Sequence, residues 1–161
     1  MEKQLVNKFE IFSIDDVSSF RLDVSTDAIT KKEQYITWNI TGKVGWYDMY
    51  FPFENAINLT KFSFVRFSLK PQNHTNLFQI LMRYNLENRI LLYETHSLEP
   101  EPIILFLNPA DPVYKDAEFN SNSVVDIIFA HLSVDELFEI KIDIEPAHFI
   151  NPTFLFFVMF S

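Results

Sequence analysis

Cysteine is absent from this sequence of 161 residues, which excludes disulfide bonds, cysteine-ligated zinc and thiol catalysis. Reducing and oxidising compartments both tolerate such a chain, so this absence leaves the compartment open. Glycine is also scarce, because Gly42 and Gly45 are the only two. A phosphate-binding loop or a dinucleotide-binding fingerprint needs glycines at spacings that these two do not provide, so both motifs are excluded.

Positive charge and long apolar runs are in short supply as well. The chain has 13 lysines and arginines against 22 acidic residues, a net charge of -9, and phosphate binding depends on cationic side chains. We therefore expect neither nucleic acid nor an anionic membrane as a partner. The longest apolar run, residues 154–160, has the length of a strand and not of a membrane helix. The first ten residues lack a signal-peptide core, so we expect that, if the parent protein is exported, its signal has been removed or lies outside this sequence.

Alternation of apolar and polar residues is the main pattern that is present. Hydrophobic residues make up 48% of the chain, with 18 phenylalanines, so a large core can form. The alternation is clearest between Gly45 and Lys70, where it predicts two half-buried strands joined by a polar corner. Further strands are expected at residues 5–12, 21–26, 35–41, 102–107, 124–129, 138–144 and 153–160, and a hairpin over residues 76–95.

This arrangement, about nine or ten short strands with almost no helical periodicity, predicts an all-β fold. We expect an antiparallel β-sandwich of the jelly-roll type, with a closed barrel as the less favoured alternative. Residues 1–161 suffice for one domain with a sizeable core. The expected connections are a charged segment at 27–34, a long loop at 110–123 and one helical turn at 131–137 that Ser133 would cap.

The strand at residues 46–51 carries the strongest functional signal. Its alternation places Trp46, Asp48 and Tyr50 on one face, about 6.5–7 Å apart per step. A flat aromatic ring packs against the apolar C–H patches of a sugar, and a carboxylate accepts hydrogen bonds from its hydroxyls. This face is therefore a candidate carbohydrate site. The alternative is that Trp46 and Tyr50 belong to the core and Tyr47 faces outward.

Neighbouring strands offer further candidates for the same site. Gln79 and Arg83 alternate with apolar residues in the first strand of the hairpin, and the return strand offers Tyr93. Amide and guanidinium groups give directional hydrogen bonds to neighbouring hydroxyls. Lys141 lies on a polar face in the strand at 138–144. The alternative for these residues is an ordinary solvated sheet face.

No catalytic constellation stands out. The histidines are scattered without metal-binding spacing, and no GxSxG motif occurs. Among many carboxylates, only Asp126, between Val125 and Ile127, lies in an apolar context, so no pair suggests glycoside hydrolysis. We expect this chain not to be an enzyme.

Several segments of the sequence follow one another in an order that is typical of one protein family. They are Phe9-Glu10, Ile36-Thr37-Trp38, Gly45-Trp46-Tyr47-Asp48-Met49-Tyr50, Ile57-Asn58-Leu59-Thr60-Lys61-Phe62, the strand Val65–Lys70 and the strand Leu137–Ile144. Together they resemble the galactose-binding-like jelly-roll carbohydrate-binding modules, especially the β-glucan-binding ones attached to glycoside hydrolases. The resemblance implies polysaccharide binding on a concave sheet face. It also implies a structural calcium ion, for which Glu10 is the candidate ligand, although residues 153–160 lack the carboxylate that the last strand of such modules supplies.

We therefore predict a non-catalytic module that binds a polysaccharide such as a β-glucan. It would be secreted, as part of or partner to a glycoside hydrolase, with a covalently linked catalytic domain as a further partner. The alternative is a structural or protein-interaction β-sandwich that binds no sugar.

Overall fold

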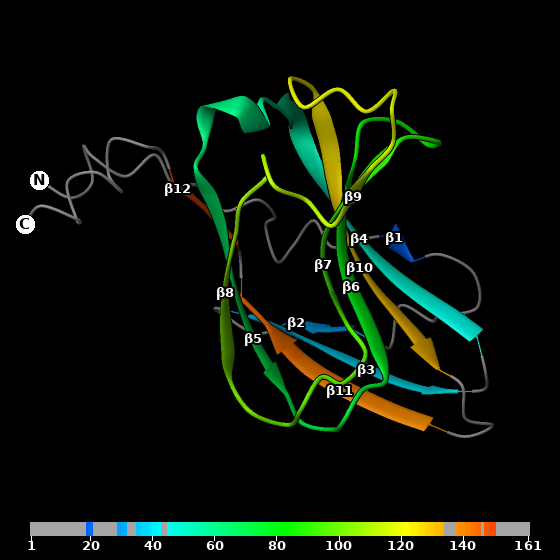
Figure 1. Ribbon diagram of the computed structural model, residues 1–161. Helices are drawn as coiled ribbons and strands as arrows, with labels where there is room; N and C mark the ends of the chain where they lie inside the picture. The colour runs from blue at the N-terminus through cyan, green and yellow to red at the C-terminus, as the bar shows by residue number, and fades with distance from the viewer. Residues whose placement is uncertain are drawn as a thin grey trace, which may run out of the picture.

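The computed structural model describes residues 19–20, 29–31, 35–42, 45–133, 138–145 and 147–150. In these residues the strands form two antiparallel sheets of six strands each, which face one another as the two layers of a sandwich (Figure 1). The all-β sandwich predicted from the alternation is therefore confirmed. No helix in the described ranges is long and apolar enough to cross a membrane.

The first sheet has the strand order β1-β4-β10-β6-β7-β9. All its neighbouring strands are antiparallel. The long strands β4 and β10 pair along most of their length, and β6 and β7 form the predicted hairpin. The strands are β1 (Ser19–Phe20), β4 (Gly45–Ile57), β6 (Leu77–Arg83), β7 (Arg89–Thr95), β9 (Tyr114–Lys115) and β10 (Val124–Ser133).

The second sheet is built around β5. One edge of β5 pairs with β11 at residues 69–71 and with β12 at residues 64–66, and the opposite edge pairs with β8. Beyond β11 follow β3 and then β2. The strands are β2 (Ile29–Lys31), β3 (Ile36–Gly42), β5 (Phe64–Pro71), β8 (Ile103–Leu107), β11 (Phe138–Ile144) and β12 (His148–Ile150).

The core lies between the sheets because each strand turns alternate side chains inward. Phe129 of β10 is fully buried at its centre and contacts Phe51 and Phe78 of its own sheet and Phe67 of the other. The ring centroids are 5.2 Å apart for Phe51, 6.2 Å for Phe78 and 5.8 Å for Phe67. Trp38 of β3 is also fully buried. Burial of one such side chain contributes roughly 1.5–3 kcal/mol, so these contacts fix the two sheets face to face.

The polar corner predicted after residue 51 begins later, because β4 continues to Ile57, and it carries the chain from one sheet to the other. β4 belongs to the first sheet and β5 to the second, and a short 3-10 helix at Leu59–Lys61 lies between them. Asn58 caps this helix, since its side chain accepts a hydrogen bond from the backbone N–H of Thr60. Leu59 is buried in the core, which anchors the corner.

Three connections differ from the sequence-based expectation. The charged segment at 27–34 contains β2, and the long loop at 110–123 contains β9. The expected helical turn at 131–137 is wrong for its first three residues, because β10 continues through Ser133. Pairing with β4 and β6 extends the strand there and overrides the local capping pattern. The strands expected at 5–12, 21–26 and 153–160, and residues 134–137, lie outside the described residues.

Candidate functional site

A groove of about 600 Å³ runs over the outer face of the first sheet, the face that points away from the core. The strands β4, β10, β6, β7 and β9 form its floor and walls. Its lining residues are Trp46, Asp48, Tyr50, Gln79, Leu81, Arg83, Leu86, Arg89, Leu91, Tyr114, Ile128 and Ala130.

The strand register arranges these side chains in rows that cross the sheet. One row is apolar along its middle and has a tyrosine at each end: Tyr50, Ile128, Leu81, Leu91 and Tyr114. The next row in one direction contains Asp48, Ala130, Gln79 and Glu94, and the next in the other contains Pro52, Asp126, Arg83 and Arg89. The groove therefore has an apolar floor with polar groups on both sides.

The apolar floor is a hydrophobic cluster separate from the main core. Leu81, Leu91, Ile128 and Ala130 are buried and contact one another, and Tyr50 packs against them. These residues lie on the outer face of the sheet, where a soluble protein usually has polar side chains. Apolar surface with a few convergent polar groups is the usual composition of a ligand site.

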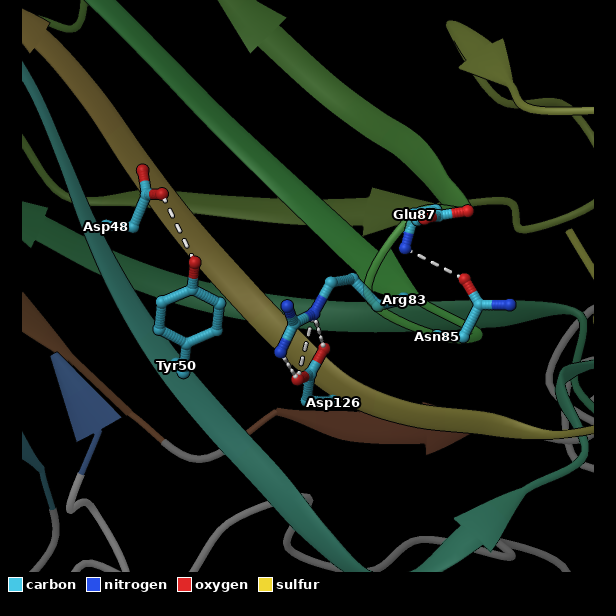
Figure 2. Close-up of polar contacts among 6 residues, drawn as sticks. All are labelled: Asp48, Tyr50, Arg83, Asn85, Glu87 and Asp126. Atoms are coloured by element: carbon cyan, nitrogen blue, oxygen red, sulfur yellow. Dashed lines mark hydrogen bonds and ion pairs between the residues drawn. The ribbon is translucent and has the colours of Figure 1, made fainter. Parts of the chain in front are cut away.

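Arg83 is held in place on this floor by its neighbours, as Figure 2 shows. Its Nε donates to both carboxylate oxygens of Asp126, at 3.0 and 3.1 Å, and its Nη2 donates to the same carboxylate. The guanidinium carbon lies 4.6 Å from the centroid of the Tyr50 ring, a cation–π contact. The Tyr50 hydroxyl in turn donates to Asp48 at 3.4 Å. Polar groups from three adjacent strands thus form one connected chain.

These connected polar groups also give Asp126 a structural role. The sequence singled it out as the one carboxylate in an apolar context. Its carboxylate is occupied by Arg83, whose Nε donates to both of its oxygens. Asp126 therefore holds Arg83 in position, and it does not line the groove itself.

The far end of the groove contains a second group of connected residues. The backbone N–H of Arg89 donates to Asp116 at 2.9 Å, and this bond, with one from the Tyr114 hydroxyl, lowers the pKa of Asp116. The same hydrogen bond and the charge of Asp116 raise the pKa of Tyr114, so its hydroxyl stays protonated at neutral pH. The charges near the groove include the cations Arg83 and Arg89, and the carboxylates Asp126, Asp116, Asp48 and Glu94.

The structure brings together five of the residues selected from the sequence: Trp46, Asp48, Tyr50, Gln79 and Arg83 all line the groove. Trp46 is 43% exposed, whereas Met49 and Phe51 on the opposite face of β4 are fully buried. The alternative, in which Trp46 and Tyr50 belong to the core, is therefore wrong for β4. The role of these residues as ligand contacts stays a prediction.

Tyr93 and Lys141 do not line the groove. A bulge in β7 leaves Leu92 without a partner in β6, so Tyr93 turns toward the core and Glu94 occupies the groove-side position opposite Gln79. Lys141 belongs to β11 of the second sheet. Glu10 lies outside the described residues, and the described ones contain no cluster of three or more His, Asp or Glu side chains that could hold a metal ion. The calcium site therefore stays a prediction.

Sequence analysis did not select Tyr114 or Leu86, which also line the groove. Tyr114 lies on a strand of two residues, which is too short to show alternation. Leu86 lies in the turn between β6 and β7. Alternation places Leu81 on the same strand face as Gln79 and Arg83. Only the number of apolar residues on both faces of these strands could have suggested a second cluster that includes Leu91 and Ile128.

Comparison with known proteins gives matches by structure alone. No sequence-family description matches the chain, and no curated protein sequence does. A family 11 carbohydrate-binding module from Clostridium thermocellum, solved with a beta-1,3-1,4-mixed-linked tetrasaccharide, is similar with a TM-score of 0.58 at 8% identity, over 76% of this chain and 80% of the module. A family 30 module of a cellulosomal cellulase from Clostridium thermocellum has a TM-score of 0.58 at 14% identity, over 92% of both chains.

The fold therefore is that of the jelly-roll carbohydrate-binding modules, as the resemblance predicted. An agarase is also similar, with a TM-score of 0.65 at 8% identity. The match covers 89% of this chain and 24% of the agarase chain, so the present chain corresponds to about a quarter of that enzyme.

Proposed function

We propose that this chain is a non-catalytic module that binds a neutral polysaccharide, of the β-glucan class, in the groove of the first sheet. The observation that carries the proposal is the groove itself: Trp46, Tyr50 and Arg83 stand over an apolar floor, beside the polar groups of Gln79 and Asp48. The similar fold of modules that include one solved with a glucan tetrasaccharide supports it.

The groove offers each kind of contact that a pyranose chain needs. Exposed aromatic rings such as Trp46 can pack against the C–H faces of sugar rings. Side-chain amides, carboxylates and guanidinium groups exchange hydrogen bonds with hydroxyls. Because Arg83 is already held by Asp126 and Tyr50, little side-chain entropy is lost when a ligand binds it. We expect an affinity of roughly micromolar to millimolar, which a handful of such contacts provides.

The charges favour a neutral ligand over an acidic one. Arg83 is compensated by Asp126, and Arg89 lies near Asp116. Asp48 and Glu94 add negative charge on the neighbouring row, and the whole chain carries -9. A polymer of uronic acids or sulfated sugars would meet more negative than positive charge.

Isothermal titration calorimetry over a glycan panel tests the proposal. The panel contains mixed-linked β-glucan, mannan, xylan, agarose and a polyuronate, and it is titrated into the wild-type chain and into Trp46→Ala. We expect heat with at least one neutral glycan, a loss of about tenfold or more in affinity for Trp46→Ala, and none with the polyuronate. Phe106→Ala is the matched control, because Phe106 is 57% exposed but lies on β8 of the other sheet. Absence of binding to every neutral glycan would contradict the proposal.

The setting of the module is part of the same proposal. We propose that it is secreted and joined to a glycoside hydrolase, which the similarity to one quarter of an agarase chain supports. The structural calcium ion that the resemblance implies, with Glu10 as a ligand, is a further expectation. Thermal melting in calcium and in a chelator tests it, since a bound ion raises the melting temperature; equal melting temperatures would contradict it.

A protein-interaction role is the second candidate, and one observation favours it. Ile104 and Phe106 are 54% and 57% exposed on neighbouring outward positions of β8. Light scattering that finds a stable oligomer, dissociated by Phe106→Glu, would support this role. A monomer at all concentrations would contradict it as far as self-association is concerned.

A further inference from the structure

We propose that Tyr114 forms a second sugar-stacking position at the end of the groove opposite Tyr50, so that the site takes a linear oligosaccharide and not a single sugar. This inference rests on the proposed function, and it names the extent and direction of the ligand. A chain would lie across the strands, from β4 to β9.

The register gives the length of the site. Tyr114 pairs with Leu91, which pairs with Leu81, and the row continues through Ile128 to Tyr50. The two tyrosines are thus separated by four strand spacings, about 19 Å in all. The residues between them are the buried apolar floor. This distance is much longer than one sugar ring, so only a chain of several rings can contact both tyrosines.

Tyr114 is exposed in the groove and is not part of the core. Its side chain is 57% exposed and lines the groove. Its hydroxyl lies near Asp116, which raises its pKa, and the faces of the ring are the surface available for packing. An aromatic side chain of this size has a strong tendency to bury its faces, and sugar rings offer matching apolar faces.

The backbone around Tyr114 is fixed on both sides. Val113 N–H donates to the carbonyl of Leu91 at 2.9 Å, and Asp116 N–H donates to the carbonyl of Arg89 at 3.0 Å. Phe119 then enters the core, and its N–H donates to the carbonyl of Asp116 at 3.0 Å. A ring on a short, hydrogen-bonded strand loses little freedom on binding, which favours its use as a contact.

Two further residues that line the groove, Leu86 and Arg89, offer contacts that a sugar chain needs. Leu86, in the turn between β6 and β7, is 86% exposed and lines the groove. Arg89 is exposed on the same side and can donate to hydroxyls. Tyr114 and Arg89 thus repeat the combination of tyrosine and arginine at the other end, where Tyr50 packs against Arg83.

A chain-length series in calorimetry tests the inference. Oligosaccharides from disaccharide to hexasaccharide, cut from the neutral glycan that binds best, are titrated into wild type, Tyr114→Ala, Tyr114→Phe and Phe106→Ala. For wild type we expect the affinity to rise with length. For Tyr114→Ala we expect a loss of about five- to tenfold with the hexasaccharide and little change with the disaccharide. Tyr114→Phe keeps the ring and should retain most of the affinity, and Phe106→Ala should match wild type.

The outcomes separate this inference from the function beneath it. If wild type binds no oligosaccharide, the proposed function fails and the second stacking position fails with it. If wild type binds and Tyr114→Ala binds equally well at every length, only the second position is overturned. An equal loss at every length would also overturn it, because that result would place Tyr114 at the primary sugar and not at the end of a chain. Thermal melting of each variant checks that the fold is intact.

Discussion

Arg83 donates hydrogen bonds to both carboxylate oxygens of Asp126, although Asp126 itself does not line the groove. The two residues are directly opposite one another on β6 and β10, and both side chains are mostly buried. Arg83 also lies over the Tyr50 ring. Asp126 is thus in a position to affect a bound ligand through Arg83, without touching the ligand.

The variant Asp126→Asn should lower both stability and sugar affinity. It removes the charge that compensates the buried guanidinium of Arg83, and breaking such a pair costs roughly 2–4 kcal/mol. Arg83 would then lose its fixed position over Tyr50, so the affinity should fall by roughly fivefold or more. Urea denaturation measures the first effect and calorimetry the second.

Glu118→Gln is the control for Asp126→Asn, because it removes the same charge at an exposed position away from the groove. It should change stability by less than about 0.5 kcal/mol. If Asp126→Asn kept the wild-type affinity, the idea that Asp126 positions Arg83 for the ligand would be wrong.

Tryptophan fluorescence should report binding through one residue. Trp46 lines the groove at 43% exposure, whereas Trp38 is fully buried. A collisional quencher should therefore reach Trp46 far more easily than Trp38, and a bound glycan should protect it. Trp46→Phe should abolish both the quenching and the protection. A glycan that binds by calorimetry and leaves quenching unchanged would place the ligand outside the groove.

Stability should decrease in acid because of His131. Burial lowers the pKa of this residue from 6.5 to about 4, and its Nδ1–H donates to the Leu77 carbonyl at 3.2 Å. The unfolded chain therefore binds this proton more readily than the folded one, so stability is complete above pH 6.5 and falls as the pH drops from 6.5 toward 4. The loss should reach about 3 kcal/mol.

Urea denaturation across this pH range measures the effect, with His131→Gln as the comparison. The carboxylates titrate in both proteins, so the difference between the two curves isolates the histidine. Wild type should be steeper than the variant between pH 6.5 and 4. Parallel curves would show that the buried imidazole does not control acid stability.

Phe129→Ala should be the most damaging of these changes. The ring joins Phe51 and Phe78 of the first sheet to Phe67 of the second, and its removal leaves a cavity at the centre of the core. A loss of about 3–5 kcal/mol is expected in urea denaturation. Phe106→Ala, at an exposed ring, should lose less than about 0.5 kcal/mol. Similar losses for the two variants would contradict the assignment of Phe129 as the centre of the core.

Local alternation predicted the faces of single strands well. In β4, Met49 and Phe51 point to the core, and Tyr50 between them points away from it. The same rule failed for Tyr93, because one unpaired residue in β7 shifts every later side chain to the other face. Nothing in the composition of residues 89–95 marks that bulge.

The pairing of strands was the second feature that the sequence alone could not predict. Sequence alternation shows which side chains share a strand face, but not which strands share a sheet. Lys141 alternates as clearly as Gln79 and Arg83 do, yet it belongs to the second sheet. Tyr114 is the opposite case: it shows no alternation, yet it lines the groove because its two-residue strand is hydrogen-bonded to β7.

A nuclear magnetic resonance titration with a mixed-linked glucan tetrasaccharide, or with whichever neutral glycan binds best in calorimetry, tests the central claim most directly. The largest shift changes should fall on the side-chain Nε–H of Arg83, the side-chain amide of Gln79, and backbone amides of the strands that carry Trp46 and Leu91. Resonances from β5 and β8, in the second sheet, should not move. Saturable changes confined to the second sheet, or no change with any neutral glycan, would contradict a sugar-binding groove on this face.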